Sequence, residues 1–189
     1  MLKNRPKTVW NTRTIVVLGL MMAVTIVLTR YLAVNVGGWF RLSLGSVSTI
    51  LTGMWFGPVA GFIAGAAADV IGLMLAPSGG WLPLITLSAA MWGVIPALMT
   101  GLIRGSRARR NAMICVAVVI TSVICQLGLT TIALVTLYGK GIIPSRIFQF
   151  ACSTPVYCLL VCILYQSPVT DIVHQGDRGG FDKTVGTIL

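Results

Sequence analysis

The stretch LTGMWFGPVAGFIAGAAADVIGLML, residues 51–75, decides the fold of this chain. It is strongly apolar, it holds a single charged residue, Asp69, and it is interrupted by the pair Gly57-Pro58. Glycine next to proline is typical of a turn between two elements. The glycine-rich flanks at residues 37–38 and 77–80 favour two separate membrane crossings joined at this turn. One long kinked helix is the alternative interpretation.

Apolar runs of this kind recur along all 189 residues. A spanning helix needs roughly 20 residues, so the length allows about six or seven crossings at most and no large domain outside the membrane. Only 10% of the residues are charged, against roughly 25% in a soluble domain. We predict an all-α integral membrane protein with six transmembrane helices within residues 14–166, and five as the alternative. The runs are Thr14 to Val34, Leu42 to Phe56, Val59 to Leu75, Leu82 to Ile103, Ala112 to Leu137 and Ile142 to Tyr165.

The basic residues predict the orientation. Eight of them lie before the first run or between the fourth and fifth runs: Lys3, Arg5, Lys7, Arg13, Arg104, Arg107, Arg109 and Arg110. The positive-inside rule makes both segments cytoplasmic. Six crossings then place both ends of the chain, residues 1–13 and 167–189, in the cytoplasm. The outer connections are residues 35–41, 77–83 and 139–144. The net charge of +10 is attributed to cytoplasmic loops and anionic lipids, and not to nucleic-acid binding.

The inventory of reactive side chains argues against catalysis. The sequence has no glutamate, and its single histidine, His174, lies in the C-terminal tail. No GxxxxGK[ST] phosphate-binding loop is present. The five cysteines lie within apolar runs without CxxC spacing, which favours buried thiols over disulfides or a metal site. We expect no catalytic residue, metal or cofactor, and a binding subunit powered by other chains. A small membrane enzyme is the hypothesis from a different class.

Charged residues inside the apolar runs are the sharpest functional signals. A carboxylate at the depth of Asp69 costs about 3 kcal/mol unless it is paired or faces a polar interior, so we expect a structural partner, with ligand contact as the alternative. Arg30, Arg41 and Arg146 are predicted to converge on the outer face, where arginines bind carboxylates and attract an anionic solute. Snorkelling to lipid headgroups is the alternative for Arg41 and Arg146. Arg30 requires either an anionic ligand or an internal partner such as Asp69.

Small residues predict where helices approach closely. Gly19 and Ala23 lie four residues apart in the predicted cytoplasmic half of the first helix, where a partner's helix can dock. Internal packing is the competing interpretation of this pair.

Outer-half position combined with side-chain chemistry gives a set of candidate binding residues. Arginines suit a carboxylate, tryptophans suit apolar or ring contact, and hydroxyl or amide groups orient a ligand. The candidates are Arg30, Asn35, Arg41, Trp81, Thr86, Ser88, Trp92, Arg146 and Gln149.

Several segments together carry a family resemblance that covers nearly the whole chain. They are Leu18-Gly19-Leu20-Met21-Met22-Ala23, Leu28-Thr29-Arg30-Tyr31, Phe40-Arg41-Leu42-Ser43-Leu44-Gly45, the segment 53–61 around Gly57-Pro58, Ala68-Asp69-Val70-Ile71-Gly72, Thr86-Leu87-Ser88-Ala89, Leu137-Tyr138-Gly139-Lys140-Gly141 and Pro144-Ser145-Arg146. The chain resembles the substrate-binding membrane subunits, or S components, of energy-coupling factor (ECF) vitamin transporters, most closely the folate branch.

The resemblance implies a six-helix subunit in a prokaryotic plasma membrane that binds a vitamin on its outer side. It also implies docking through the first helix onto a membrane coupling protein driven by two cytoplasmic ATPases. The AxxxA docking motif of such subunits corresponds here to Gly19 and Ala23, with glycine in place of the first alanine.

Aromatic elements typical of folate subunits are replaced in this chain. Trp81-Leu82-Pro83-Leu84 stands where those subunits carry Phe-Pro-Gly-Phe, and Thr130-Thr131-Ile132-Ala133 stands where they carry Asn-Thr-Leu-Trp. A pterin ring gains from flat stacking surfaces, which aliphatic and hydroxyl side chains do not provide. Folate is the first expected ligand, and pantothenate, a smaller anionic vitamin, is the alternative.

Overall fold

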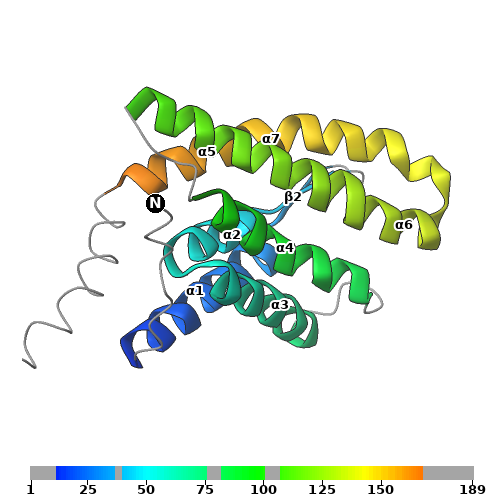
Figure 1. The fold of residues 1–189 in the computed structure, drawn as a ribbon. Helices are drawn as coiled ribbons and strands as arrows, with labels where there is room; N and C mark the ends of the chain where they lie inside the picture. The colour runs from blue at the N-terminus through cyan, green and yellow to red at the C-terminus, as the bar shows by residue number, and fades with distance from the viewer. Residues whose placement is uncertain (1–11, 37–39, 76–81, 101–106, 168–189) are drawn as a thin grey trace, which may run out of the picture.

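The computed structural model describes residues 12–36, 40–75, 82–100 and 107–167. These residues form a helical bundle with one short hairpin (Figure 1). The elements in chain order are α1 (Thr12–Arg30), β1 (Val34–Val36), β2 (Phe40–Leu42), α2 (Gly45–Phe56), α3 (Pro58–Leu75), α4 (Pro83–Met99), α5 (Arg107–Ser122), the π-helical η2 (Val123–Thr130), α6 (Thr131–Tyr138), the 3-10 turn η3 (Lys140–Ile142) and α7 (Ile143–Gln166). Because α5, η2 and α6 follow one another without a break, they make one long rod. The prediction of an all-α fold is confirmed apart from the hairpin.

Three helices in the described part of the chain are long and apolar enough to cross a membrane. They are Pro58–Leu75, Arg109–Leu137 and Ile143–Gln166. Thr14–Arg30 and Pro83–Met99 are shorter apolar helices. Helix α2 has 12 residues and is therefore only about 18 Å long, less than the roughly 30 Å of a bilayer's hydrocarbon core. The number of crossings accordingly stays a prediction.

The predicted break at Gly57-Pro58 is confirmed. Helix α2 ends at Phe56, and α3 begins at Pro58. Gly57 has φ 92°, a left-handed conformation that favours glycine, and its N–H donates to the Gly53 carbonyl at 2.9 Å. Proline fits the first position of a helix because that position needs no N–H donor. Since α2 and α3 then pack against each other, the alternative of one long kinked helix is wrong.

Helix α2 lies at the centre of the bundle, in contact with α1, α3, α4 and α7 (Figure 1). All but two of its residues are buried. Thr49 and Thr52 donate to carbonyls of their own helix, as where Thr52 bonds the Ser48 carbonyl at 2.8 Å, whereas Ser48 donates to the Met21 carbonyl of α1 at 3.4 Å. Ile50, Met54 and Trp55 of α2 join Val118 of α5 and Val161 of α7 in the main hydrophobic core. The long rod of α5, η2 and α6 lies beside α7 on one side of α2, with α1 and α3 on the other (Figure 1).

Glycines allow α2, α3 and α4 to touch backbone to backbone. A Cβ atom added to Gly53 would overlap the Gly93 carbonyl oxygen, and one added to Gly61 would lie 2.9 Å from the Gly53 Cα. A Cβ on Gly65 would likewise overlap the Ala89 carbonyl oxygen. The small residues of the third apolar run therefore serve internal packing.

The structure corrects two expectations about local form. An antiparallel hairpin occupies the outer connection predicted at residues 35–41, and Asn35 pairs with Arg41 in it. Val34 and Leu42, which the sequence assigns to the flanking apolar runs, also pair in this hairpin. Its strands alternate apolar and polar residues, but at three residues each they are too short for that period to stand out from the apolar runs. The first helix accordingly ends at Arg30 and not at Val34.

Candidate functional site

Polar side chains gather toward one end of the bundle. At this end α1, α3 and α6 finish, and α2, α4 and α7 begin, next to the β1–β2 hairpin (Figure 1). We call it the hairpin end. Two groups of polar residues are built there, one around Asp69 and one around Arg146.

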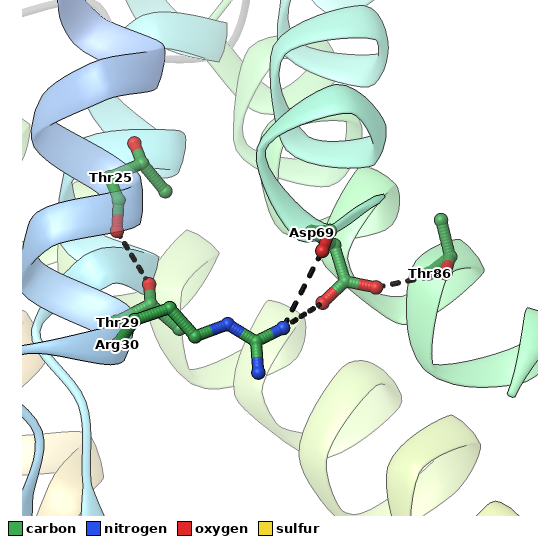
Figure 2. Close-up of polar contacts among 5 residues, drawn as sticks. All are labelled: Thr25, Thr29, Arg30, Asp69 and Thr86. Carbon is green, nitrogen blue, oxygen red and sulfur yellow. Dashed lines mark hydrogen bonds and ion pairs between the residues drawn. The ribbon is translucent and has the colours of Figure 1, made fainter. Parts of the chain in front are cut away.

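The first group is an ion-pair cluster of Arg30, Asp69 and Thr86 (Figure 2). The Arg30 Nη2 atom lies 3.5 Å from Asp69 Oδ1 and donates to the Asp69 backbone carbonyl, also at 3.5 Å. The Thr86 hydroxyl donates to Asp69 Oδ2 at 2.8 Å. The side chains of Arg30 and Asp69 are 8% and 17% exposed. The cluster therefore joins α1, α3 and α4 through one largely buried carboxylate.

Local sequence explains how the guanidinium reaches Asp69. Gly72 lies three residues after Asp69, on the same face of α3. A Cβ atom at Gly72 would lie 3.0 Å from Arg30 Nε, so the glycine makes room for the arginine side chain. On α1, the Thr29 hydroxyl donates to the Thr25 carbonyl at 2.7 Å, which satisfies it within its own helix (Figure 2).

The expected structural partner of Asp69 is thus Arg30, supported by Thr86. A buried carboxylate and a buried guanidinium each cost free energy alone, and here each compensates the other. Arg30 and Thr86 are engaged with Asp69, and their contact with a ligand stays a prediction.

The second group begins with a pair of hydroxyls between α4 and η2. Ser88, which is 2% exposed, donates to the Cys125 backbone carbonyl at 3.0 Å. Its oxygen also lies 3.0 Å from the Thr130 hydroxyl. Because the only proton of Ser88 goes to Cys125, Thr130 is the donor in this contact.

Two pairs of polar side chains follow, Gln126 with Ser153 between η2 and α7, and Gln149 with Arg146 on α7. Gln126 Nε2 donates to Ser153 Oγ at 3.2 Å, and Ser153 Oγ donates to the Gln149 backbone carbonyl at 2.6 Å. Arg146 Nη1 donates to Gln149 Oε1 at 2.8 Å. Gln126 and Ser153 are buried, whereas Gln149 and Arg146 are partly exposed. The two pairs are thus connected only through the backbone of α7.

The charge of Arg146 has no carboxylate partner among the described residues. Asp69 is the only acidic residue in that part of the chain, and it pairs with Arg30. Arginine carries several N–H donors in a planar fork that matches a carboxylate. The arrangement therefore suits an anion at the hairpin end.

The remaining candidates are placed as follows. Trp92 is 8% exposed and packs edge-on against Tyr157, with ring centroids 5.6 Å apart, so it belongs to the core. Tyr157 donates in turn to the Ser43 carbonyl at 2.8 Å, which ties α7 to the segment after the hairpin. Asn35 and Arg41 pair across the hairpin, and Trp81 lies outside the described residues. Ligand contact by these candidates stays a prediction.

Gly19 and Ala23 lie on an exposed face of α1. A Cβ atom added to Gly19 would meet nothing within 4 Å, and Ala23 is exposed. Leu20 and Val16 beside them are 60% and 65% exposed. Within the described residues, this pair is not used for internal packing.

Reasoning from sequence missed Gln126, Thr130 and Ser153. A signal was present, since Gln126 is the only amide in the fifth apolar run and Ser153 follows Gln149 by one helical turn. The contact between Gln126 and Ser153 joins two different helices, and spacing along the chain does not reveal it.

Comparison with known proteins gives a consistent result. Residues 9–165 match the family described as ECF-type riboflavin transporter, S component. The folate transporter FolT of Clostridium novyi (strain NT) is 30% identical over 144 residues, which cover 75% of this chain and 81% of that protein.

Solved structures share the fold. The crystal structure of FolT bound with folic acid has a TM-score of 0.67 at 26% identity, and the match covers 79% of this chain and 90% of that one. The S component of a bacterial ECF transporter has a TM-score of 0.56 at 21% identity, with coverages of 80% and 95%.

The family match extends over most of the chain, and it agrees with the helical bundle and with the resemblance carried by the sequence motifs. Members of this family are vitamin-binding subunits of ECF transporters in the bacterial plasma membrane. The chain therefore belongs to the family of ECF-type transporter S components.

Proposed function

We propose that this chain is a folate-binding S component and that Arg146 receives a carboxylate of the vitamin. The carrying observation is the position of Arg146 at the hairpin end, held by Gln149 at 2.8 Å and without a carboxylate partner in the described residues. Folate as the ligand is supported by the FolT relative at 30% identity and by the fold shared with folate-bound FolT. The chain itself is expected to catalyse no reaction.

Equilibrium binding to the purified protein tests this proposal. Tritiated folate should bind at about one molecule per chain, and unlabelled riboflavin or pantothenate should displace it only at much higher concentration. Arg146→Met should weaken folate binding by at least tenfold, because truncating one partner of a buried charge pair costs about 2 kcal/mol or more. Lys140→Met, which removes a cation just before α7, is the matched control and should bind like the parent.

Two results would overturn the proposal. Preferential binding of riboflavin or pantothenate would show that folate is not the ligand. Equal folate affinity in the parent and in Arg146→Met would show that the arginine does not bind the vitamin. Snorkelling of Arg146 to lipid headgroups predicts that second result.

We further propose that α1 docks onto a membrane coupling protein driven by two cytoplasmic ATPases, through the face that carries Gly19 and Ala23. The exposure of this pair supports the proposal, because small residues leave a flat surface on which another helix packs closely. Exposed Leu20 and Val16 beside the pair would supply apolar contact.

Copurification tests the docking face. In a strain that also expresses a tagged coupling protein and its ATPases, Gly19→Leu and Ala23→Leu should each abolish copurification and leave folate affinity unchanged. Ala112→Leu places the same enlargement on an exposed position of α5 and should copurify normally. Loss of assembly in all three variants, or in none, would contradict a specific role for this face.

The proposed topology has six crossings, with residues 1–13 and 167–189 in the cytoplasm. The concentration of Lys and Arg before and at the start of α1, and between α4 and the first turn of α5, supports it. Cysteines introduced in turn at Lys3, Gly79 and Lys183 test it with a membrane-impermeant maleimide on intact cells. Only the cysteine at position 79 should react, and labelling at either terminus would overturn the topology.

A further inference from the structure

Three of the five cysteines meet where α5 packs against α7. The Cys115 Sγ atom lies 3.6 Å from the Cys162 Sγ atom. The Cys158 thiol donates to the Cys115 backbone carbonyl at 3.8 Å, and the Cys162 thiol donates to the Asn111 carbonyl at 3.9 Å. We call Cys115, Cys158 and Cys162 the thiol cluster.

Helical periodicity brings the thiol cluster together. Asn111 and Cys115 lie four residues apart on α5, and Cys158 and Cys162 lie four residues apart on α7, so each pair shares one face of its helix. The two faces meet beside the main hydrophobic core, against which Cys158 and Cys162 pack. Because Cys115 and Cys162 are 47 residues apart, spacing along the sequence does not reveal their contact.

The thiol cluster lies far from the candidate site at the hairpin end. Helix α5 begins and α7 ends at the opposite end of the bundle (Figure 1). Cys162 is close to the end of α7, whereas Arg146 is close to its start. The 16 residues between them correspond to about 24 Å along the helix. The chemistry of the thiols can therefore be measured apart from ligand binding.

The contact between Cys115 and Cys162 suits the formation of a disulfide bond. Such a bond is about 2.0 Å long, so the two sulfurs must approach by about 1.6 Å, which rotation of the two side chains can supply. All three cysteines of the cluster are partly exposed, whereas Cys125 is fully buried. Full burial in apolar surroundings makes a thiol inert, so partial exposure distinguishes the cluster from a packed core cysteine.

We propose that Cys115 and Cys162 are a modification site for peroxides, at which oxidation joins α5 to α7 through a disulfide bond. The sulfur of one cysteine attacks an oxygen of hydrogen peroxide and the O–O bond breaks, which gives a sulfenic acid and one water that takes up the thiol proton. The second sulfur then attacks the sulfenic sulfur, the S–S bond forms, and the S–O bond breaks. A second water leaves with the second thiol proton. Two thiols are thus oxidised to one disulfide, and one peroxide is reduced to two waters.

Mass spectrometry of the full-length chain in detergent tests the site. The protein is reduced, freed of reductant and treated with hydrogen peroxide. The intact parent should lose two hydrogens, and a digest should contain the peptide of Cys115 linked to that of Cys162, with Cys158 still open to alkylation. Cys115→Ala and Cys162→Ala should each prevent the loss of hydrogen. Cys152→Ala removes an exposed cysteine of the same helix, and as the control it should oxidise like the parent.

Thermal unfolding gives a second measurement. A bond that closes a loop of 47 residues restricts the unfolded chain, so the oxidised parent should melt roughly 5–15 °C above the reduced parent. A thiol reductant should restore the lower melting temperature. Cys115→Ala should melt at the same temperature before and after peroxide. If this variant does not fold, the linked peptide of the parent still decides the question.

Three outcomes would overturn the inference. A gain of oxygen without the loss of two hydrogens would mean that the sulfurs oxidise separately. A linked peptide that joins two chains through Cys152, or that joins Cys115 to Cys158, would assign a different pair. An equal melting temperature of the reduced and oxidised parent would mean that no bond ties α5 to α7. None of these measurements uses a ligand, so failure of the proposed function leaves the inference intact.

Discussion

Removal of Arg30 is the most informative perturbation of the ion-pair cluster. In Arg30→Met the Asp69 carboxylate loses a cation whose Nη2 lies 3.5 Å from Oδ1, while the Thr86 hydrogen bond at 2.8 Å remains. In Asp69→Asn the Arg30 guanidinium is left in the same surroundings with its side chain 8% exposed. A lone carboxyl can become neutral by binding a proton, whereas a guanidinium stays charged. We therefore expect Asp69→Asn to be the more destabilising change.

The magnitude follows from the geometry. At 3.5 Å and an effective dielectric constant of about 20, the attraction between the two charges is about 5 kcal/mol, and desolvation of both groups opposes it. Leaving one partner of a buried pair alone typically costs about 3–5 kcal/mol. We expect about 3 kcal/mol for Arg30→Met, which corresponds to a fall of roughly 6–12 °C in melting temperature for a chain of this size.

Thermal unfolding in detergent, followed by tryptophan fluorescence, measures the loss, and folate binding is measured on the same samples below the transition. The double variant Arg30→Met/Asp69→Leu should recover most of the stability, because it leaves no buried charge. Folate affinity should change little in all three variants when they are folded. Unchanged melting of Arg30→Met together with a tenfold or greater loss of folate affinity would refute this reasoning and make Arg30 a ligand residue.

Three further predictions concern packing. Gly53→Ala should lower stability by about 1–3 kcal/mol, because its Cβ would overlap the Gly93 carbonyl oxygen. Gly19→Ala is the control and should change stability by less than about 0.5 kcal/mol. Equal melting temperatures of the two variants would contradict the close approach of α2 and α4. Ser88→Ala should cost about 1–2 kcal/mol in thermal unfolding, because the Cys125 carbonyl and the Thr130 hydroxyl lose a buried partner. Trp92→Leu should lower stability by about 2–4 kcal/mol through lost contact with Tyr157. Trp92→Phe keeps an aromatic ring against Tyr157 and should lose less than half as much stability. A change in folate affinity without a change in stability would place Trp92 at the ligand.

Much of the fold was predictable because it depends on local signals. Long apolar runs, the Gly57-Pro58 break and the requirement that Asp69 find a partner each follow from residues close together in the sequence. The structure agrees on helices in each apolar run and on an internal partner for Asp69. The pairs Gly19 with Ala23 and Gly61 with Gly65 look alike in sequence, but the structure exposes the first pair and buries the second.

The rest depends on contacts between distant residues. Strands of three residues carry too little alternation to be recognised, so the sequence predicts only a connection where Asn35 and Arg41 pair in a hairpin. A π-helical turn is stabilised by partners such as Ser88, which lies 37 residues from Cys125, and not by the composition of the turn. Gln126 finds its hydrogen-bond partner, Ser153, 27 residues away on another helix.

Mass spectrometry of the small molecule that copurifies with the protein tests the central claim most directly. The parent and Arg146→Met are expressed in the same cells, purified under the same mild conditions and denatured to release what they hold. The proposed function predicts folate at close to one molecule per chain from the parent and little or none from Arg146→Met. Riboflavin or pantothenate as the released molecule, or equal folate from both proteins, would contradict it.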